Sequence, residues 1–543
     1  MAEPIKFEEM RVLIVDDNAG MRASMRSILG TMGVLQMEMA HSANDAIRRI
    51  QTRPFDIIVC DYFLGDESDG QQLLEQLRHN KLIALSSVFV MVTAERAYER
   101  VVSAVELAPD DYLIKPFTSD IIQTRLERVL EKKSTLAPIY NLVERGRFAD
   151  ATRVCEQLLQ QTSKYTIDIL RLLAELYVSQ GNFQAAQGVY ERVTTMRAVP
   201  WARMGLAKML HFNDHNPEAE ELLELVVAES PDYMAAYDLL AEVCDAQHKA
   251  DRAQEVLARA VAASPYTMHR QKSMGDVAMR NGDLETAEAA FNQVVERGKT
   301  SFFRETEDYA NLSRVQLERG KCDEALNTMR NARTSFNNSP DIQFASAVME
   351  SLIHKKSGNE DAAAKALDNA LALQTTHDLK PGKDLSLDMA NACLQQHRDE
   401  DAKRIVQTLV ENNHDNVALL DQAKQLFASA GQGEVGNALV DDSVNGIVNL
   451  NNLGVRAAQQ GNFDESVRLL TEAASKLPDN MQIILNAAQV LLVAIDKQGW
   501  NESYMESARH YLTSVRNKRS DHPKLLTISK FAQDIARKYG MAV

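Results

Sequence analysis

The sequence predicts a two-part protein: an α/β domain with a doubly wound, five-stranded parallel sheet, followed by an all-α array of helix pairs. Up to about residue 130, short apolar runs alternate with helical patterns, which is the order that parallel sheets require. After about residue 136 the strand-like runs disappear, and helical segments broken by Gly, Asn, Asp or Pro continue almost to the end. At 543 residues, the chain is also too long for one ordinary hydrophobic core.

Five short runs in the first part have the composition of buried strands. They are largely apolar and rich in β-branched residues, as expected for parallel strands that helices cover on both faces. The runs are RVLIVD (11–16), LQMEMA (35–40), FDIIVC (55–60), SVFVMV (87–92) and DYLI (111–114). Helical patterns separate these runs, so we predict five βα units.

A short pattern recurs through the second part, with glycine at its first position and a small residue at its last. It reads GRFADA (146–151), GNFQAA (181–186), GDLETA (282–287), GKCDEA (320–325) and GNFDES (461–466). Ala219, Ala253 and Ala287 are spaced 34 residues apart, as are Pro231 and Pro265. The glycine ends the first helix of a unit, and the alanine lets the second helix pack closely. This period, with two helices per unit, resembles the tetratricopeptide repeat (TPR) and implies a superhelical array.

Two segments divide the array in our prediction. HDLKPGKD (377–384) combines Pro and Gly, and SAGQGEVGNALVDDSVNG (429–446) is glycine-rich without a clear repeat. The predicted domains are residues 1–131, a first array at 132–380, a weak repeat with a glycine-rich break at 381–446, and terminal repeats with a capping helix at 447–543. The join at 131–138 lacks a flexible Gly/Ser stretch, so we expect a fairly rigid connection.

Composition and charge narrow the classes of function. The formal net charge of −16 disfavours broad electrostatic binding to nucleic acid or to anionic membranes. The five scattered cysteines contain no C-x-x-C pair, so neither a zinc cage nor a disulfide framework is predicted. The N-terminus lacks the pattern of a secretory signal, and no apolar run is long enough to span a membrane. We therefore expect a soluble protein in a reducing cytoplasm.

Charged and polar residues follow four of the five predicted strands. Asp16 and Asp17 close the first, Asp61 follows the third, Thr93 the fourth and Lys115 the fifth. Parallel strands bring these ends to one sheet edge, where open α/β folds bind ligands. Alone, Asp61 is equally well explained as a helix N-cap. Clustered acids repel one another unless a hard cation lies among them, and Mg²⁺ prefers carboxylates, water and phosphate oxygens. Such a cluster with a lysine suits phosphoryl transfer.

Four motifs of the first part match a known family. VDDN, VCDYFLG, VTAE and YLIKPF make the domain resemble, over its full length, the receiver domain of bacterial two-component response regulators. The resemblance implies that Asp61 accepts a phosphoryl group from a histidine kinase or phosphotransfer protein. The resemblance also implies that Asp17, Asp61 and the backbone carbonyl of Phe63 bind Mg²⁺ directly, with help from Asp16. Lys115 and Thr93 would contact the phosphoryl oxygens. Thr93 and Tyr112 would be the switch residues, which change position on phosphorylation.

The region after Asp61 departs from the usual receiver pattern. Gly65 stands where the family has proline, and the GDESDG segment (65–70) is one residue longer than the common loop. Phe63 places a bulky apolar side chain two residues beyond Asp61. We expect Phe63 to hinder attack by water and to lengthen the lifetime of the phosphorylated form.

Three other patterns are better explained structurally. GQGEVG (431–436) matches G-x-G-x-x-G but follows a helical run, so we predict a loop without a dinucleotide. His211 and His215 lack an evident third metal ligand. The tail from Arg509 to Val543 carries eight Lys or Arg, which we assign to a solvated capping helix, with nucleic-acid contact as the alternative.

The helical array is expected to bind a protein or peptide. Stacked helix pairs form an extended concave surface, and no catalytic constellation is evident after residue 130, so we do not predict a catalytic output domain. The first helices of the units carry candidate contact residues of mixed charge: Arg171, Glu175, Trp201, Lys208, Glu242, Lys272, Asp276 and Arg314.

We therefore predict a phosphorylation-controlled adaptor with no membrane partner. One alternative is a transcriptional regulator that contacts DNA directly, although the acidic charge balance speaks against it. Another is a phosphate sink whose TPR scaffold binds its partner constitutively. Assembly into a homo-oligomer is compatible with each of these accounts.

Overall fold

The computed structural model describes residues 6–65, 69–93, 109–161, 164–299, 301–519 and 522–541. The chain divides into two compact units, which we describe separately: Met1–Tyr177 with Phe183–Arg304, and Val178–Asn182 with Glu305–Val543. Across these described stretches, no helix combines the length and the apolar character needed to cross a lipid bilayer.

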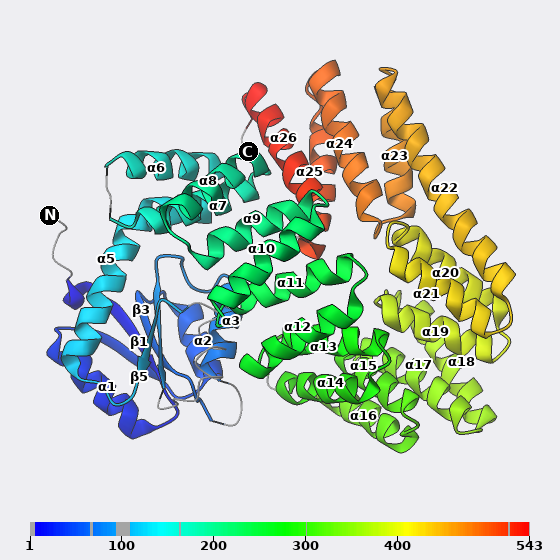
Figure 1. The fold of residues 1–543 in the computed structure, drawn as a ribbon, viewed down its shortest axis with the longest axis horizontal. Coiled ribbons are helices and arrows are strands. Elements are labelled where there is room, and N and C mark those ends of the chain that lie inside the picture. Colours follow the sequence, from blue (N-terminus) through cyan, green and yellow to red (C-terminus); the bar gives the residue numbers. More distant parts are fainter. Residues whose placement is uncertain are drawn as a thin grey trace. The chain divides into compact units, whose positions relative to one another are not determined.

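The first unit begins with a parallel sheet, which in the described residues has five strands, as the sequence predicts (Figure 1). The strands are β1 (Arg11–Val15), β2 (Gln36–Ala40), β3 (Ile57–Asp61), β4 (Val88–Thr93) and β5 (Asp111–Ile114). Their order is β2-β1-β3-β4-β5, and each neighbouring pair is parallel. The chain order reverses between β1 and β3, and such a switch point is where this class of sheet binds its ligands.

Helices cover both faces of this sheet. α1 (Ala19–Thr31) and α5 (Ser119–Glu144) lie on one face, and α2 (Ala43–Thr52) and α3 (Gly70–His79) on the other (Figure 1). Because successive strand residues point to opposite faces, Ile14 and Val59 join the core with α1 and α5, whereas Val15 and Cys60 join the core with α2 and α3. Two covered faces explain the continuous apolar runs. The helix predicted between β4 and β5 lies outside the described residues.

Helix α5 passes from the α/β domain into the array without interruption, so the predicted join at 131–138 is helical. Its second half still contacts the α/β domain. Lys133 Nζ lies 2.9 Å from a carboxylate oxygen of Asp110 and donates a hydrogen bond of 2.6 Å to the Leu85 carbonyl. The Leu85 amide in turn donates to the Glu144 carboxylate. A helix anchored in this way is a stiff connection.

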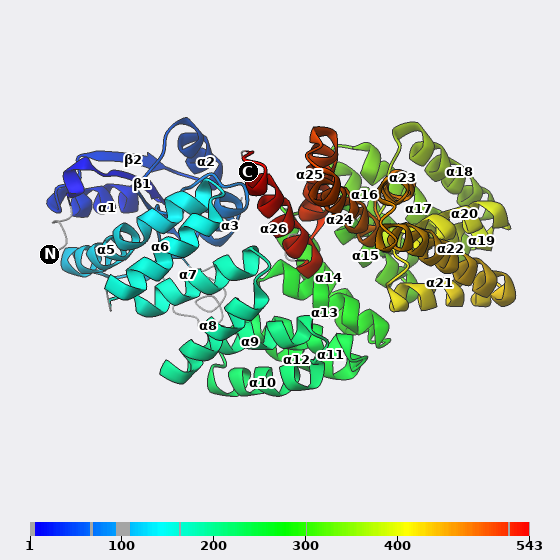
Figure 2. The same cartoon turned by 90° about the horizontal axis from the view of Figure 1, so that it is seen from above.

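Helix pairs follow α5 in the first unit (Figure 2). They are α6 (Phe148–Gln161), α7 (Thr166–Ser179), α8 (Phe183–Met196), α9 (Pro200–Phe212), α10 (Asn216–Glu229), α11 (Met234–Ala246), α12 (Ala250–Ala263), α13 (Met268–Arg280) and α14 (Leu284–Gly298). Gly282, between α13 and α14, has a φ of +73°, a conformation that favours glycine. Ala219, Ala253 and Ala287 are fully buried, as close packing of the second helices requires.

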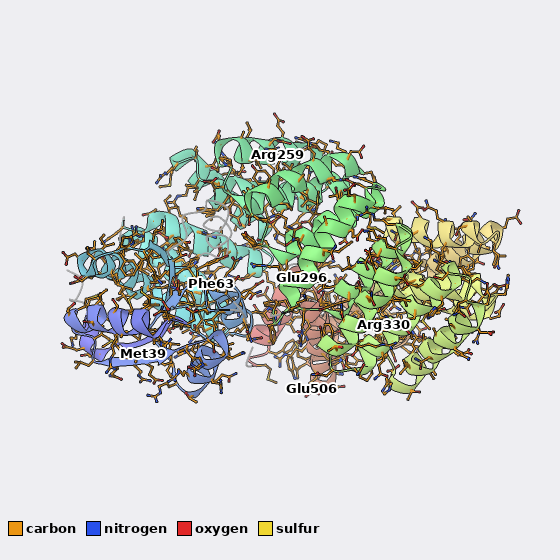
Figure 3. All side chains as sticks on the ribbon, turned by 90° about the horizontal axis from the view of Figure 1, so that it is seen from below. Met39, Phe63, Arg259, Glu296, Arg330 and Glu506 are labelled. Carbon is orange, nitrogen blue, oxygen red and sulfur yellow. The ribbon has the colours of Figure 1, made fainter. Side chains whose placement is uncertain are left out.

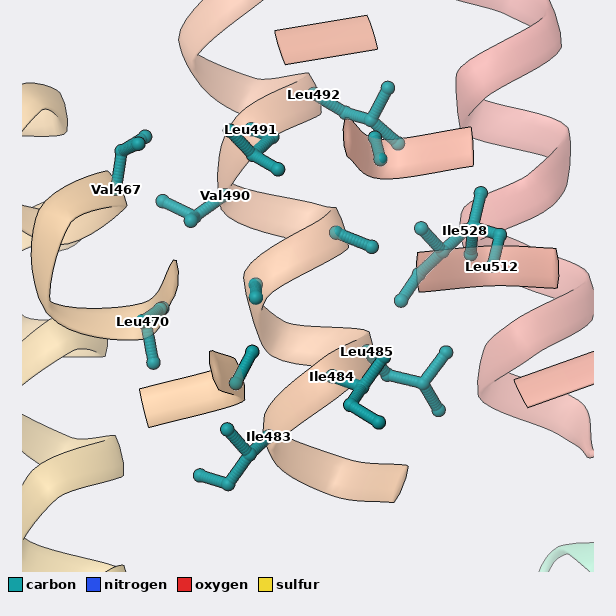
Figure 4. Close-up of a cluster of buried hydrophobic side chains, with 14 of the residues drawn as sticks. Val467, Leu470, Ile483, Ile484, Leu485, Val490, Leu491, Leu492, Leu512 and Ile528 are labelled. Carbon is teal, nitrogen blue, oxygen red and sulfur yellow. The ribbon is translucent and has the colours of Figure 1, made fainter. Parts of the chain in front are cut away.

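The second unit continues the same pattern. Its helices are α15 (Thr306–Glu318), α16 (Cys322–Ser335), α17 (Pro340–Lys356), α18 (Glu360–His377), α19 (Lys383–Gln395), α20 (Asp399–Asn412), α21 (Val417–Ser429), α22 (Gly433–Gln459), α23 (Phe463–Lys476), α24 (Met481–Gln498), α25 (Glu502–Lys518) and α26 (Pro523–Lys538). Figure 4 shows the core at its C-terminal end, a buried cluster that includes Ile484 and Leu491 of α24, Leu512 of α25 and Ile528 of α26. Burying such side chains contributes about 1.5–3 kcal/mol each.

The structure corrects the prediction of a glycine-rich break at 429–446. Most of this segment is the first half of α22, so the GQGEVG motif (431–436) is not wholly a loop. Gly431, with a φ of +76°, forms the turn after α21. Gly436 lies inside α22, where a Cβ atom would come within 2.3 Å of the Phe427 Cβ. The two glycines therefore serve a turn and a close helix contact, and they do not interrupt the array.

Candidate functional site

Three aspartates and a lysine meet at the C-terminal edge of the sheet. Carboxylate oxygens of Asp16, Asp17 and Asp61 all lie within 4.8 Å of one another. Lys115 Nζ lies 2.9 Å from Asp61 Oδ2 and 3.3 Å from Asp16 Oδ2. The three aspartates lie close together because β1 and β3 are neighbouring strands that end at the same edge of the sheet. The structure thus brings together the acidic and basic residues that the sequence singled out.

Thr93 and Tyr112 lie on the neighbouring strands. Thr93 ends β4, between the strands that carry Asp61 and Lys115, and is 3% exposed. Its carbonyl accepts a hydrogen bond of 2.7 Å from the Lys115 amide, and the Lys115–Pro116 peptide bond is cis. Tyr112 is partly buried in β5 and packs against the core beneath α2 and α3. The two expected switch residues therefore lie on adjacent strands, of which β4 neighbours the strand that ends at Asp61.

The start of α1 holds the acidic pair in place. The Asn18 side chain caps this helix by accepting from the amides of Gly20 and Met21. The Asn18 amide donates to Asp16 Oδ1 at 2.8 Å. The Arg22 guanidinium donates to the backbone carbonyls that precede the cap, at 2.7 and 3.0 Å. Asp16 is nearly buried, whereas Asp17 is exposed and can offer its carboxylate to an incoming group.

Burial and neighbouring charges set the electrostatics of the pocket. Burial raises the pKa of Asp61 to about 6, and the nearby Asp16 carboxylate adds to this rise, while the hydrogen bond and charge of Lys115 oppose it. For Lys115, burial lowers the pKa, but the hydrogen bonds and charges of Asp61 and Asp16 outweigh burial and raise it. The lysine therefore stays charged while the carboxylates compete for it. A second positive charge among the carboxylates would relieve their repulsion.

The donor set fits a hard divalent cation. Within the described ranges, Asp16, Asp17 and Asp61 are the one group of acidic, histidine or cysteine side chains with metal-ligand spacing. Three carboxylates suit Mg²⁺, which prefers oxygen ligands and retains several water molecules. The ring nitrogens of His211 face Asn216 and Glu242, and among the described residues His211 belongs to no group with metal-ligand spacing.

The segment after Asp61 shows why this chain departs from the receiver pattern. Gly65 has a φ of +86°, which proline cannot adopt because its ring fixes φ near −65°. Phe63 is 54% exposed, and its backbone forms an isolated β-bridge with Asp69. Residues 66–68 of the GDESDG segment lie outside the described residues.

Seven of the eight predicted contact residues lie on first-unit helices α7, α9, α11 and α13. Arg171 and Glu175 form an ion pair of 3.1 Å on α7, and the Arg171 guanidinium lies 5.9 Å from the Trp201 ring centroid. Lys208 Nζ lies 5.4 Å from the Phe212 ring centroid. The structure therefore joins Arg171, Glu175 and Trp201 into one aromatic and charged patch on α7 and α9. Glu242 lies on α11, and both Lys272 and Asp276 lie on α13.

Arg314 differs from its predicted role as an outward contact residue. Its guanidinium forms three hydrogen bonds of 2.6–3.0 Å with the Asp388 carboxylate, and its side chain is only 18% exposed. Burial lowers the pKa of Arg314, but the charge of Asp388 outweighs burial and raises it. Arg314 lies on α15 and Asp388 on α19, so the pair connects these two helices. A buried guanidinium is stable only beside a charged partner.

Comparison with protein-family models matches residues 12–127 to the response regulator receiver domain and residues 171–233 to the tetratricopeptide repeat. The chain is a receiver domain followed by tetratricopeptide repeats. The receiver match indicates a phosphorylation-dependent response regulator of a two-component system.

Three proteins similar to the receiver part of the chain illustrate its match. Chemotaxis protein CheY-3 of Vibrio cholerae serotype O1 is 28% identical over 130 residues, which are 24% of this chain and 98% of that protein. Chemotaxis protein CheY of Pseudomonas aeruginosa is 28% identical over 123 residues, or 23% of this chain and 98% of that protein. A CheY-like receiver domain protein from Methanospirillum hungatei, with a solved structure, is 26% identical; the match covers 23% of this chain and 96% of that chain, with a TM-score of 0.21.

Sequence reasoning missed two residues beside the site, Asp69 and Arg297. Asp69 caps α3 in a capping box with Gln72, and the D-G-Q-Q letters at 69–72 carry that signal. Arg297 lies in the last turn of α14 and donates to the Asp69 carboxylate at 3.2 Å. No local sequence pattern predicts that Arg297 is the partner of Asp69.

Proposed function

We propose that this protein is a response regulator in which Asp61 is the phosphoacceptor and the TPR array is a protein-binding output without catalytic activity of its own. The observation that carries the proposal is the 2.9 Å contact of Lys115 Nζ with Asp61 Oδ2 inside the three-carboxylate cluster. This arrangement supplies a nucleophile, a fixed cation and oxygen ligands at one sheet edge, which phosphoryl transfer needs.

In the proposed reaction, an Asp61 carboxylate oxygen attacks the phosphorus of a phosphohistidine on a histidine kinase or phosphotransfer protein. The new O–P bond of the aspartyl phosphate forms as the N–P bond breaks, and the histidine leaves with the electron pair. Lys115 holds the attacking carboxylate and then stabilises charge on the transferred oxygens. A bound Mg²⁺, held by Asp17 and Asp61 with the Phe63 carbonyl, would neutralise further charge.

After phosphoryl transfer to Asp61, Thr93 and Tyr112 would change position. Thr93 ends β4, the strand between the one that ends at Asp61 and the one that leads to Lys115, and we propose that its hydroxyl bonds to a phosphoryl oxygen. Tyr112 lies on β5 beside β4, where Met91 is its register partner. We infer that movement of Thr93 shifts Tyr112 between two packed positions, which biases a two-state equilibrium.

The patch of Arg171, Glu175 and Trp201 is the best supported output surface. It lies on α7 and α9, inside the residues that match the tetratricopeptide repeat. Trp201 packs against the buried Tyr190 ring, with the two ring centroids 6.1 Å apart, and lies beside the Arg171 guanidinium. Aromatic side chains and arginine are the residue types that dominate protein interfaces, and we propose a peptide or protein ligand with groups of both signs.

The proposed function is tested by incubating the full-length protein with a small phosphodonor such as phosphoramidate, or with a candidate kinase, and mapping the alkali-labile and hydroxylamine-sensitive phosphoryl groups. We expect one acyl phosphate, at Asp61. A protein that gains no phosphoryl group under either condition would contradict the proposal.

Removal of divalent cations is expected to stop phosphorylation. With excess EDTA, the initial rate should fall by about 100-fold or more, comparable to removing a preorganised charge-stabilising group. Adding excess MgCl₂ should restore the rate. The rate is measured by phosphate-affinity electrophoresis of the full-length protein, and an EDTA-insensitive rate would refute the magnesium site.

Phe63→Asn is expected to shorten the lifetime of the phosphorylated form, because the smaller polar side chain admits and orients water. We expect hydrolysis about tenfold faster, which corresponds to ~1.4 kcal/mol of barrier. Leu35→Asn is the matched control, since Leu35 is an exposed apolar residue of the same domain before β2. The decay is followed after the phosphodonor is removed. Equal decay rates for Phe63→Asn and the unmodified protein would exclude a shielding role for Phe63.

A further inference from the structure

Helix α3 of the receiver domain contacts the helical array at both of its ends, within the first unit. At its N-terminus, Asp69 Oδ2 accepts from Arg297 Nη2 at 3.2 Å, and Gln72 Nε2 donates to the Arg297 carbonyl at 3.4 Å. At its C-terminus, the His79 ring meets the Phe303 ring edge-on at 5.0 Å. Figure 3 labels Phe63, in the loop before α3, and Glu296, the residue before Arg297 on α14.

The Asp69–Arg297 pair is partly withdrawn from water. The Asp69 side chain is 13% exposed and the Arg297 side chain 27%. The Arg297 guanidinium also lies 4.8 Å from the Tyr266 ring centroid, which fixes it from a second side. Since charges in such a setting are weakly screened, this contact is more than a solvated surface pair.

Asp69 is connected to the phosphoacceptor by a short series of rigid contacts. Its Oδ1 accepts from the Gln72 amide at 2.8 Å, which fixes the carboxylate at the start of α3. The next residue, Gly70, donates its amide to the Tyr62 carbonyl at 2.8 Å. A Cβ atom on Gly70 would come within 2.3 Å of the Asp61 carbonyl oxygen. The start of α3 therefore packs directly on the backbone of Asp61.

The start of α3 also packs on the residue before Asp61. The Cys60 thiol donates to the Asp61 carbonyl at 3.1 Å, and a Cβ atom on Gly70 would lie 3.0 Å from the Cys60 sulfur. A phosphoryl group on Asp61 adds negative charge to this neighbourhood. Arg297 supplies the opposite charge from the array.

We propose that Arg297 is a positioning residue for the phosphorylation site, and that the Asp69–Arg297 ion pair couples the phosphorylation of Asp61 to helix α14 of the array. This inference rests on the proposed function and adds a route through Asp69 and Gly70 at the start of α3, separate from Thr93 and Tyr112. Coupling between two sites is reciprocal for binding equilibria, so a ligand that displaces α14 also changes the affinity of the Asp61 pocket for a phosphoryl mimic.

The test is a double-mutant cycle in the full-length protein with Asp69→Asn, Arg297→Gln and the double variant. Asparagine is as good an N-cap as aspartate, so Asp69→Asn removes the charge while α3 stays capped. Arg280→Gln is the matched control, because Arg280 pairs with Asp245 at 2.6 Å on neighbouring array helices. Arg297→Lys keeps the positive charge but replaces the planar guanidinium group with an ammonium group. The readouts are the dissociation constant for beryllofluoride with Mg²⁺ and the rate of phosphorylation by phosphoramidate.

We expect each single variant to change the beryllofluoride dissociation constant by about fivefold, the lower range of allosteric coupling. The double variant should match either single variant, because both remove the same interaction. Arg280→Gln should behave as the unmodified protein, and Arg297→Lys should recover part of the effect. A merely structural role would lower thermal stability without this non-additive pattern.

Two results would overturn the inference. One is an unchanged dissociation constant in every variant, and the other is a double variant whose effect equals the sum of the single effects in free energy. In both cases phosphorylation of Asp61 would persist, so the proposed function would stand. If the unmodified protein bound neither phosphoryl group nor beryllofluoride, the proposed function itself would fail, and the inference with it.

Discussion

Asp61→Asn is expected to reduce phosphoryl incorporation by the full-length protein to background. The amide cannot form an acyl phosphate by this route, while its size leaves the sheet edge intact. Asp56→Asn is the matched control, because Asp56 lies just before the same strand and accepts from the Arg11 amide at 2.8 Å. Incorporation is measured with a radiolabelled phosphodonor. Retained incorporation in Asp61→Asn would show that another residue is the acceptor.

Asp388→Ala is expected to destabilise the second unit by about 3 kcal/mol, the lower range for breaking a buried ion pair. The change leaves the Arg314 guanidinium, which is 18% exposed, without the carboxylate that accepts three of its hydrogen bonds. The free energy of unfolding is obtained from urea titrations followed by circular dichroism.

Glu465→Ala is the control for this stability prediction. It removes an ion pair with Arg468 whose side chains are 41% and 60% exposed, so little change is expected. Combining Asp388→Leu with Arg314→Met should recover stability, since apolar pairs often replace buried ion pairs without loss. Equal stability of Asp388→Ala and the unmodified protein would contradict a structural role for the pair.

The fold was predictable because each of its signals is local. FDIIVC reads as a strand buried on both faces, and the sheet indeed has α1 and α5 on one face and α2 and α3 on the other. The 34-residue spacing of Ala219, Ala253 and Ala287 marks positions that are fully buried. Asp16, Asp17, Asp61, Thr93 and Lys115 were found by the same reasoning, since strand ends of a parallel sheet share an edge, whereas the expected roles of Phe63 and Tyr112 came from the resemblance to receiver domains.

The misjudged features depend on distant contacts. The glycines at 431–436 are typical of a loop in sequence, but in the structure Gly436 lies in a helix and packs against Phe427. Arg314 reads as a surface residue, but its partner lies 74 residues further along the chain. Arg297 and Asp69 are separated by 228 residues, so no local pattern could pair them. The periodicity of apolar residues predicts which face of a helix is buried. It does not predict which distant side chain each residue contacts, because tertiary packing determines that.

The central claim is that phosphorylation of Asp61 changes the surface of the helical array. Hydrogen–deuterium exchange of the full-length protein, with and without Mg²⁺ and beryllofluoride, tests this claim most directly. The account predicts altered exchange in helices of the array between α7 and α14, and no alteration in Asp61→Asn. Exchange that changes only within residues 1–131 would contradict it and would leave the array as a constitutive scaffold.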